Sequence, residues 1–171
     1  MRRQYYDVIF CDIDDTLIYG FWTDLMRITW NIFRSNTLSD LLMWLQYKFN
    51  LYRVNTKLVQ FIKNQHSSNT YISRVIFITV RKPSVSTRKM LQNIFRRYKL
   101  PNYFTVHELA SDNAALDKTA ETLDILSHLD KVEDKYNCCF IDDNKDVRKS
   151  IERNLEIDTF DPIAMREGLI G

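Results

Sequence analysis

Three short apolar runs, each followed by acidic or hydroxyl-bearing residues, constrain the fold of this 171-residue chain more than any other feature. The runs cover residues 8–11, 75–78 and 138–141, and each is rich in β-branched or aromatic residues. Such runs are typical of strands buried on both faces of a parallel sheet. Residues 84–98 and 117–129, between the last two runs, carry apolar side chains at helical spacing. We therefore expect an α/β fold, a doubly wound and mainly parallel sheet with a small helical insert.

Weaker patterns extend this alternation and also interrupt it. Residues 103–106 and 155–160 are further strand candidates, and residues 146–154 a further short helix. Residues 21–66 hold all three tryptophans and break the alternation, so we expect an insert of two or three helices between the first two strands. Thr37 with Asp40, and separately Asn55, fit helix starts inside it. The predicted division is a core of residues 1–20 and 67–171 and a cap of residues 21–66.

Composition limits the class of protein. Apolar residues make up 45% and charged residues 27%, which excludes a disordered chain and a disulfide-dense miniprotein. No apolar stretch approaches the length of a membrane span, and the first residues do not resemble a signal peptide. Of the three cysteines, Cys138 and Cys139 are neighbours whose side chains point to opposite faces of a strand, so they are poorly placed to bridge. We expect reduced thiols and a cytoplasmic location.

Charge is distributed unevenly along the chain. Residues 1–107 hold 16 Lys and Arg against 6 Asp and Glu, whereas residues 108–171 hold 8 against 16. Residues 41–107 contain 12 basic residues and no acidic one. The basic stretch either forms a solvated surface that pairs with the acidic half or attracts an anionic, phosphate-rich substrate.

Polar residues follow each apolar run at the point where a parallel sheet binds its ligands. They are Asp12 and Asp14 after the first run, Thr79 and Arg81 after the second, and Asp142, Asp143 and Asp146 after the third. Capping of the following helices could explain a single aspartate, but several carboxylates at one rim would repel one another unless neutralised. Carboxylates without a nearby His or Cys favour a hard cation, and we expect Mg²⁺. A carboxylate can also act as the nucleophile in phosphoryl transfer.

The order of these residues resembles the motifs of the haloacid dehalogenase (HAD) superfamily. Residues 8–17, VIFCDIDDTL, resemble its first motif, an apolar strand followed by Asp-x-Asp-x-Thr. The strand that ends in Thr79, the lysine Lys118, and the sequence Asp142-Asp143 resemble the second, third and fourth motifs. The resemblance covers residues 7 to 147 and implies a Rossmann-like core with a short helical cap. Asp15 stands where the family often has glycine, and an aspartate tolerates the unusual backbone angle better than most residues.

The resemblance implies a role for each matching residue. Asp12 would be the nucleophile, Asp14 the general acid and base, Thr79 a hydrogen-bond donor to the phosphoryl group, and Lys118 its counter-charge. Mg²⁺ would be held by the Asp12 carboxylate, the Asp14 carbonyl and Asp142, with Asp143 and Asp146 as further candidates. Arg81 is a candidate for binding substrate. Lys82 and Lys89 also follow the second strand and compete with Lys118 for the third-motif role.

Other α/β classes fit less well. A phosphoacceptor receiver domain places its acidic pair before the acceptor aspartate, which is the reverse of the order in this sequence. A kinase is not expected either, because the sequence has no G-x-x-x-x-G-K-[ST] loop. We expect a magnesium-dependent phosphatase that acts through an aspartyl-phosphate on a nucleotide or another small phosphorylated molecule. The alternatives are a phosphatase of the 3′ or 5′ ends of nucleic acid strands and a non-catalytic module that binds a phosphorylated ligand.

Overall fold

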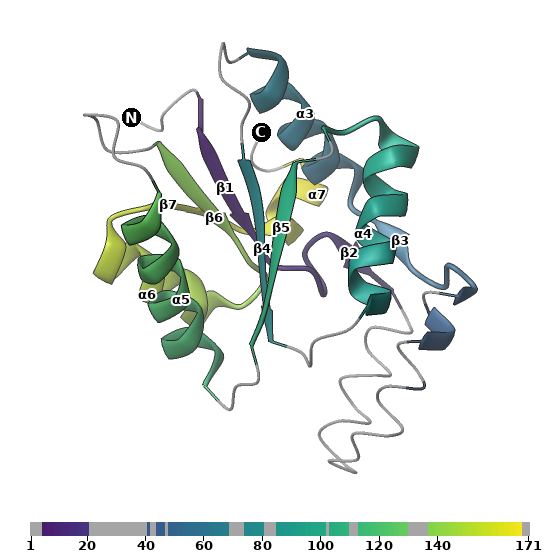
Figure 1. Ribbon diagram of the computed structural model, residues 1–171. Helices are drawn as coiled ribbons and strands as arrows, with labels where there is room; N and C mark the ends of the chain where they lie inside the picture. Colours follow the sequence, from purple (N-terminus) through teal and green to yellow (C-terminus); the bar gives the residue numbers. More distant parts are fainter. Residues whose placement is uncertain are drawn as a thin grey trace.

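A parallel sheet of five strands, in the order β5-β4-β1-β6-β7, forms the centre of the computed structural model (Figure 1). The structure describes residues 5–20, 41, 44–46, 48–68, 74–80, 85–101, 103–109, 113–129 and 137–168. The strands are β1 (Val8–Cys11), β4 (Arg74–Val80), β5 (Phe104–Leu109), β6 (Cys138–Ile141) and β7 (Asp158–Phe160). All neighbouring strands run parallel, so their carboxyl ends meet at one edge, at the bottom of Figure 1. The predicted α/β fold is confirmed, with both weaker strands beginning later than the pattern indicated.

Helices cover both faces of this sheet. Helices α3 (Thr56–Ser68), α4 (Val85–Tyr98) and α7 (Pro162–Arg166) pack on one face, and α5 (Ala114–His128) and α6 (Lys145–Leu155) on the other. Alternate strand residues divide between the two cores, because neighbouring side chains of a strand point to opposite faces. In β1, Ile9 packs with the first group of helices and Phe10 with the second. This double burial explains why the strands are apolar throughout rather than alternating.

Helix boundaries follow from local caps. Helix α5 begins three residues before the predicted start, because the Asn113 side chain accepts a hydrogen bond from the Leu116 amide. Asn144 caps α6 in the same way. Asn55 precedes α3, as predicted, and its side chain accepts from the Leu58 amide at 3.1 Å.

The region between β1 and β4 is described only in part. A small antiparallel pair, β2 (Ile18–Tyr19) with β3 (Arg53–Val54), brings the turn after β1 next to the segment that precedes α3. Helix α3 buries Leu58 and Ile62 against the sheet. The predicted helix start at Thr37 and Asp40 lies outside the described residues, and the cap boundaries at residues 21 and 66 stay a prediction.

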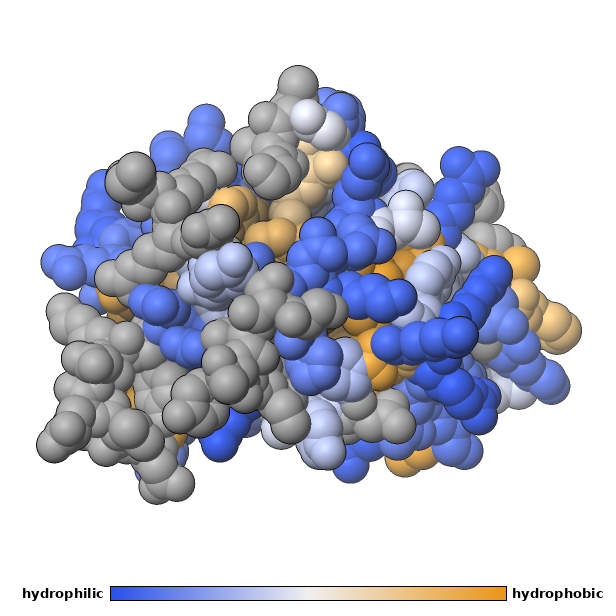
Figure 2. Space-filling model, turned by 90° about the horizontal axis from the view of Figure 1, so that it is seen from above, coloured by the Kyte–Doolittle hydropathy of each residue, from blue (hydrophilic) through white to orange (hydrophobic). Residues whose placement is uncertain are grey.

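Two further features of the fold are the character of its surface and the state of its cysteines. Viewed onto the end where the strands begin, the described surface is mainly hydrophilic, with small hydrophobic areas between hydrophilic residues (Figure 2). None of the helices in the described part of the chain combines the length and apolar character of a membrane span. All three cysteines are buried and none forms a disulfide, so the prediction that Cys138 and Cys139 do not bridge is confirmed.

Candidate active site

The two acidic segments, one with Asp12 and one with Asp142, meet at the carboxyl ends of β1 and β6. Phe10 pairs with Phe140 and Cys11 with Ile141 across the two strands. The Asp12 amide then donates to the Ile141 carbonyl at 2.9 Å, which continues the pairing one residue beyond β1. Asp12 is 6% exposed and Asp142 is fully buried. The sheet therefore holds two carboxylates side by side in a region that excludes water.

Lys118 supplies a positive charge to this pair. It lies on α5 and is itself only 3% exposed. Its Nζ lies 2.9 Å from Asp12 Oδ1 and 2.7 Å from Asp142 Oδ2. Of the competing lysines, Lys89 is exposed on α4 and Lys82 lies outside the described residues. Of the two candidate lysines that the structure describes, Lys118 is the one that contacts Asp12 and Asp142.

The loop after Asp12 turns sharply. The Ile13 carbonyl accepts hydrogen bonds from the amides of Leu17 and Ile18, at 2.9 and 3.0 Å. Asp15 adopts the left-handed region with φ of 54°, which Asp and Asn reach at lower cost than bulky residues. This fits the expectation that Asp15 tolerates a position where glycine is common in the HAD superfamily. Asp14 lies within this turn, two residues from Asp12, and is partly buried.

Thr16 joins the turn to the third acidic group. The Asp143 amide donates to Thr16 Oγ1 at 3.1 Å. Asn55 Nδ2 donates to the Thr16 carbonyl and to the Pro162 carbonyl, each at 3.2 Å. A turn after β1, the loop after β6 and the starts of α3 and α7 are therefore tied together.

Three carboxylates form a candidate metal site, which we call the carboxylate cluster: Asp12, Asp142 and Asp143. One oxygen from each lies within 4.8 Å of the others. Asp146 is exposed in the first turn of α6, where its amide donates to Asn144 Oδ1 at 2.9 Å. The structure thus brings Asp143 to the two deeply buried aspartates, while Asp146 occupies a helix-start position.

The electrostatics of the carboxylate cluster fit a hard divalent cation. Burial, and then the nearby Asp12 charge, raise the pKa of Asp142 to about 6 despite Lys118. Burial, Asp12 and Asp142 raise the pKa of Asp143 to about 7. Burial alone would lower the pKa of Lys118, but the two carboxylates outweigh it and hold that pKa above its usual range. One ammonium therefore leaves negative charge uncompensated, and oxygen ligands of this kind suit Mg²⁺ or a similar ion.

Thr79 reaches the same edge from the neighbouring strand. It is 1% exposed near the end of β4, which pairs with β1 through Cys11 and Phe77. The predicted substrate residue Arg81 lies outside the described residues.

Arg148 is a functional candidate that the sequence analysis missed. Its Nη1 donates to the Asp142 carbonyl and, at 2.8 Å, to the Asp143 carbonyl. Its Nη2 donates to Asp161 Oδ2 at 2.8 Å, and Asp161 caps α7. Arg148 thus fixes the backbone of both aspartates. The only sequence signal was an arginine one turn into the helix that follows the acidic pair.

Comparisons with known proteins add a likeness of fold. No family model matches the sequence, and no curated protein matches it. Two similar solved structures are described as "Structure of the Pnkp1/Rnl/Hen1 RNA repair complex" and "Structure of Pnkp1/Rnl/Hen1 complex", with TM-scores of 0.54 and 0.53 and identities of 16% and 15%. Each match covers 94% of this chain but only 44% and 47% of the matched chains. The chain therefore spans less than half the length of the chains whose fold it shares.

Proposed function

We propose that this chain is a metal-dependent phosphomonoester hydrolase whose nucleophile is Asp12. The observation that carries the proposal is the contact of Lys118 with both Asp12 and Asp142 at the ends of adjacent parallel strands. A buried ammonium between two carboxylates orients the nucleophile and offers positive charge to an incoming phosphoryl group. The HAD-like order of motifs assigns the same residues to the same roles.

The reaction would proceed in two steps. An Asp12 carboxylate oxygen attacks phosphorus, the bond between phosphorus and the leaving oxygen breaks, and Asp14 gives its proton to that oxygen. Water then attacks the aspartyl-phosphate, Asp14 takes a proton from the water, and inorganic phosphate leaves Asp12 as a free carboxylate. Thr79 and Lys118 would bind the phosphoryl oxygens in both steps. Mg²⁺, held by Asp12, Asp142 and Asp143 with the Asp14 carbonyl, would reduce the repulsion between carboxylate and phosphate.

Two substrate classes follow from this chemistry: nucleotides and the phosphorylated 3′ or 5′ ends of nucleic acid strands. Two observations favour strand ends. Residues 41–107 carry 12 basic residues and no acidic one. The two similar structures are also described as complexes of Pnkp1, Rnl and Hen1, in one case as an RNA repair complex. We therefore place strand ends first and free nucleotides second.

A phosphate-release screen with Mg²⁺ tests the proposal. It compares nucleoside monophosphates, sugar phosphates and end-phosphorylated oligonucleotides. Reactions that contain a metal chelator give the background rate. We expect Asp12→Asn to abolish release while the fold persists by circular dichroism. The matched control is Asp124→Asn, an exposed aspartate on α5 with 67% side-chain exposure. Unchanged turnover in Asp12→Asn would contradict the nucleophile assignment, and no release from any substrate would favour a non-catalytic binding module.

A further inference from the structure

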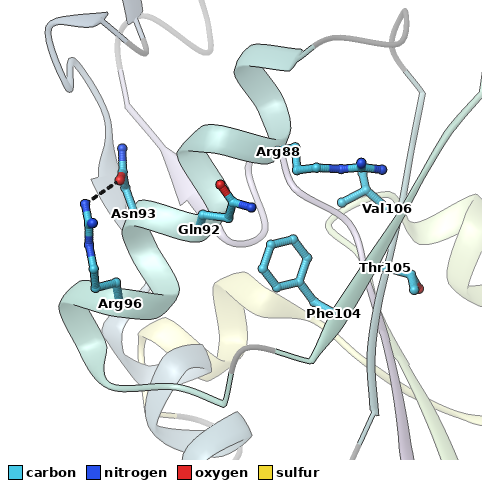
Figure 3. Close-up of a pocket in the computed structure, with 7 residues that line it drawn as sticks. All are labelled: Arg88, Gln92, Asn93, Arg96, Phe104, Thr105 and Val106. Carbon is cyan, nitrogen blue, oxygen red and sulfur yellow. Dashed lines mark hydrogen bonds between the residues drawn. The ribbon is translucent and has the colours of Figure 1, made fainter.

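An open groove lies between α4 and β5, apart from the carboxylate cluster. Its volume is about 800 Å³, and its lining includes Arg88, Gln92, Asn93, Arg96, Phe104 and Val106. We call it the α4–β5 groove. Figure 3 shows the side chains of Arg88 and Gln92 extending from α4 towards β5, and the ring of Phe104 projecting from β5 towards the helix.

The lining combines cations, amides and an aromatic ring. Arg88, Gln92 and Arg96 are spaced four residues apart, so they share one side of α4, and all three are exposed. The two arginines are separated by about 12 Å along the helix axis, at 1.5 Å per residue. Arg96 is held by a hydrogen bond from its Nη2 to Asn93 Oδ1 at 2.9 Å. The ring of Phe104 is fixed against Phe95, with centroids 4.6 Å apart. An aromatic ring beside cations is the combination that binds single strands through stacking and phosphate contacts.

The α4–β5 groove lies in a strongly basic part of the sequence. Residues 41–107, which include all of α4 and most of β5, contain no acidic residue. Among the residues that the structure describes, no ion pair with a carboxylate involves Arg88 or Arg96. Two exposed guanidinium groups without a carboxylate partner suit an anionic ligand with phosphates at more than one position.

Sheet register connects the α4–β5 groove to the active site. Val106 pairs with Phe77, and Phe77 pairs with Cys11, the residue before Asp12. Val106 therefore lies level with the end of β1, two strands away, which is about 10 Å at the usual strand spacing. Strand β5 is the edge of the described sheet, so no other described strand pairs with its outer backbone groups. A nucleic acid strand that leaves the active site in the direction of β5 would reach the groove within this distance.

We propose that the α4–β5 groove binds a single-stranded nucleic acid, with Arg88 and Arg96 on two of its phosphates and Phe104 against a base. The inference rests on the proposed function in one respect: it takes the strand in the groove to be the same strand whose terminal phosphate enters the active site. Binding by itself needs no turnover. The site is thus a second contact region that would distinguish a strand end from a free nucleotide.

Binding is tested with a fluorescein-labelled 12-residue oligouridylate without a terminal phosphate, by fluorescence anisotropy at several salt concentrations. We expect Arg88→Gln with Arg96→Gln to weaken binding roughly tenfold and to lower the slope of log K against log salt by about 1.4, at 0.7 per phosphate contact. Phe104→Leu should weaken binding about fivefold with little change in slope, provided that thermal unfolding shows it folded. The matched control is Lys149→Gln with Arg153→Gln, an exposed basic pair on α6 across the sheet.

The results of this binding experiment can be distinguished from the results of the phosphate-release screen that tests the proposed function. Binding that the groove variants weaken, without phosphate release, would support the groove and contradict the hydrolase. Phosphate release from end-phosphorylated oligonucleotide with an unchanged KM in the groove variants would support the hydrolase and overturn the groove. Three other results would overturn the assignment of the groove as a nucleic acid site. The first is that the wild-type chain does not bind the probe, and the second is that the α6 control variant loses as much affinity as the groove variants. The third is that polyglutamate displaces the probe as well as an unlabelled oligonucleotide does.

Discussion

The carboxylate cluster and the α4–β5 groove both concentrate charge, but in different surroundings. In the first, Lys118 lies between Asp12 and Asp142, and all three side chains are almost fully removed from water. In the second, Arg88 and Arg96 are exposed, and no carboxylate pairs with them in the described part of the chain. Interactions between buried charges are strong because little water screens them, whereas exposed charges act weakly and over a range set by salt. Substitutions in the two regions should therefore differ in size and in salt dependence.

Removal of Lys118 should have the largest effect. Lys118→Met leaves two buried carboxylates adjacent without a counter-charge, so we expect about 3–5 kcal/mol lower unfolding free energy. Phosphate release should fall by about a hundredfold to a thousandfold through loss of positive charge at the phosphoryl group. Urea unfolding and initial rates measure the two effects.

A double variant sharpens this test. Asp142→Asn in the Lys118→Met background removes one of the repelling charges, so it should recover part of the lost stability but none of the activity. Lys149→Met, on an exposed face of α6, should match wild type in both measurements. A stable Lys118→Met variant would show that the cluster is less buried in solution than the structure indicates.

Arg148 should act on the metal through the loop backbone. Arg148→Met releases the carbonyls of Asp142 and Asp143, so we expect Mg²⁺ affinity to fall about tenfold to a hundredfold, the usual cost of losing a group that orients metal ligands. The concentration of Mg²⁺ needed for half-maximal activity should rise while kcat at saturating metal changes less. Arg153→Met is the control, and equal effects in both variants would assign Arg148 a general structural role.

Acidification should weaken metal binding by about twentyfold between pH 8 and pH 6, because protons compete for Asp143, with a pKa of about 7, and then for Asp142, with a pKa of about 6. Both values lie above those of an unfolded chain, so the metal-free folded state holds more protons between pH 4 and 7. Its stability should therefore rise as pH falls from 7 to 5. Thermal unfolding with and without Mg²⁺ measures both trends. Asp143→Asn should move the loss of metal binding below pH 6, and an unmoved profile would contradict the assignment.

Salt should produce the smallest effect, and only in the α4–β5 groove. Two phosphate contacts predict about sevenfold weaker oligonucleotide binding between 50 and 200 mM salt. Turnover of a nucleoside monophosphate, which has a single phosphate group and no further phosphates for the groove to bind, should change much less. Equal salt dependence for both substrates would remove the distinction between the two regions.

Local signals were sufficient to predict the central strands and the approach of Asp12 and Asp142 at their carboxyl ends. Residues 8–11 and 138–141 are apolar throughout because both faces of the sheet are covered, and parallel strands that end in aspartate must bring those aspartates together. The left-handed backbone of Asp15 agrees with the expectation drawn from the glycine that the HAD superfamily often has at this position, and aspartate tolerates that conformation.

Contacts between distant parts of the chain were not predictable in the same way. Asn55 fits a helix cap from sequence, but its bonds to the carbonyls of Thr16 and Pro162 depend on how α3 and α7 pack. The hydrogen bonds from Arg148 to the loop after β6, and the α4–β5 groove, likewise arise from packing between elements. No periodicity or motif encodes these relationships, because they depend on side-chain direction in three dimensions.

The burial of Cys11 beside Asp12 has a consequence for chemical labelling. Its Sγ donates to the Asp12 carbonyl, and burial followed by the charges of Asp12 and Asp142 raises the pKa of the thiol. Cys139 has a raised pKa for the same leading reason. Because the thiolate is the reactive form, alkylating reagents should modify these two residues slowly while the chain is folded. The rate of iodoacetamide labelling would then report how often the centre of the sheet opens.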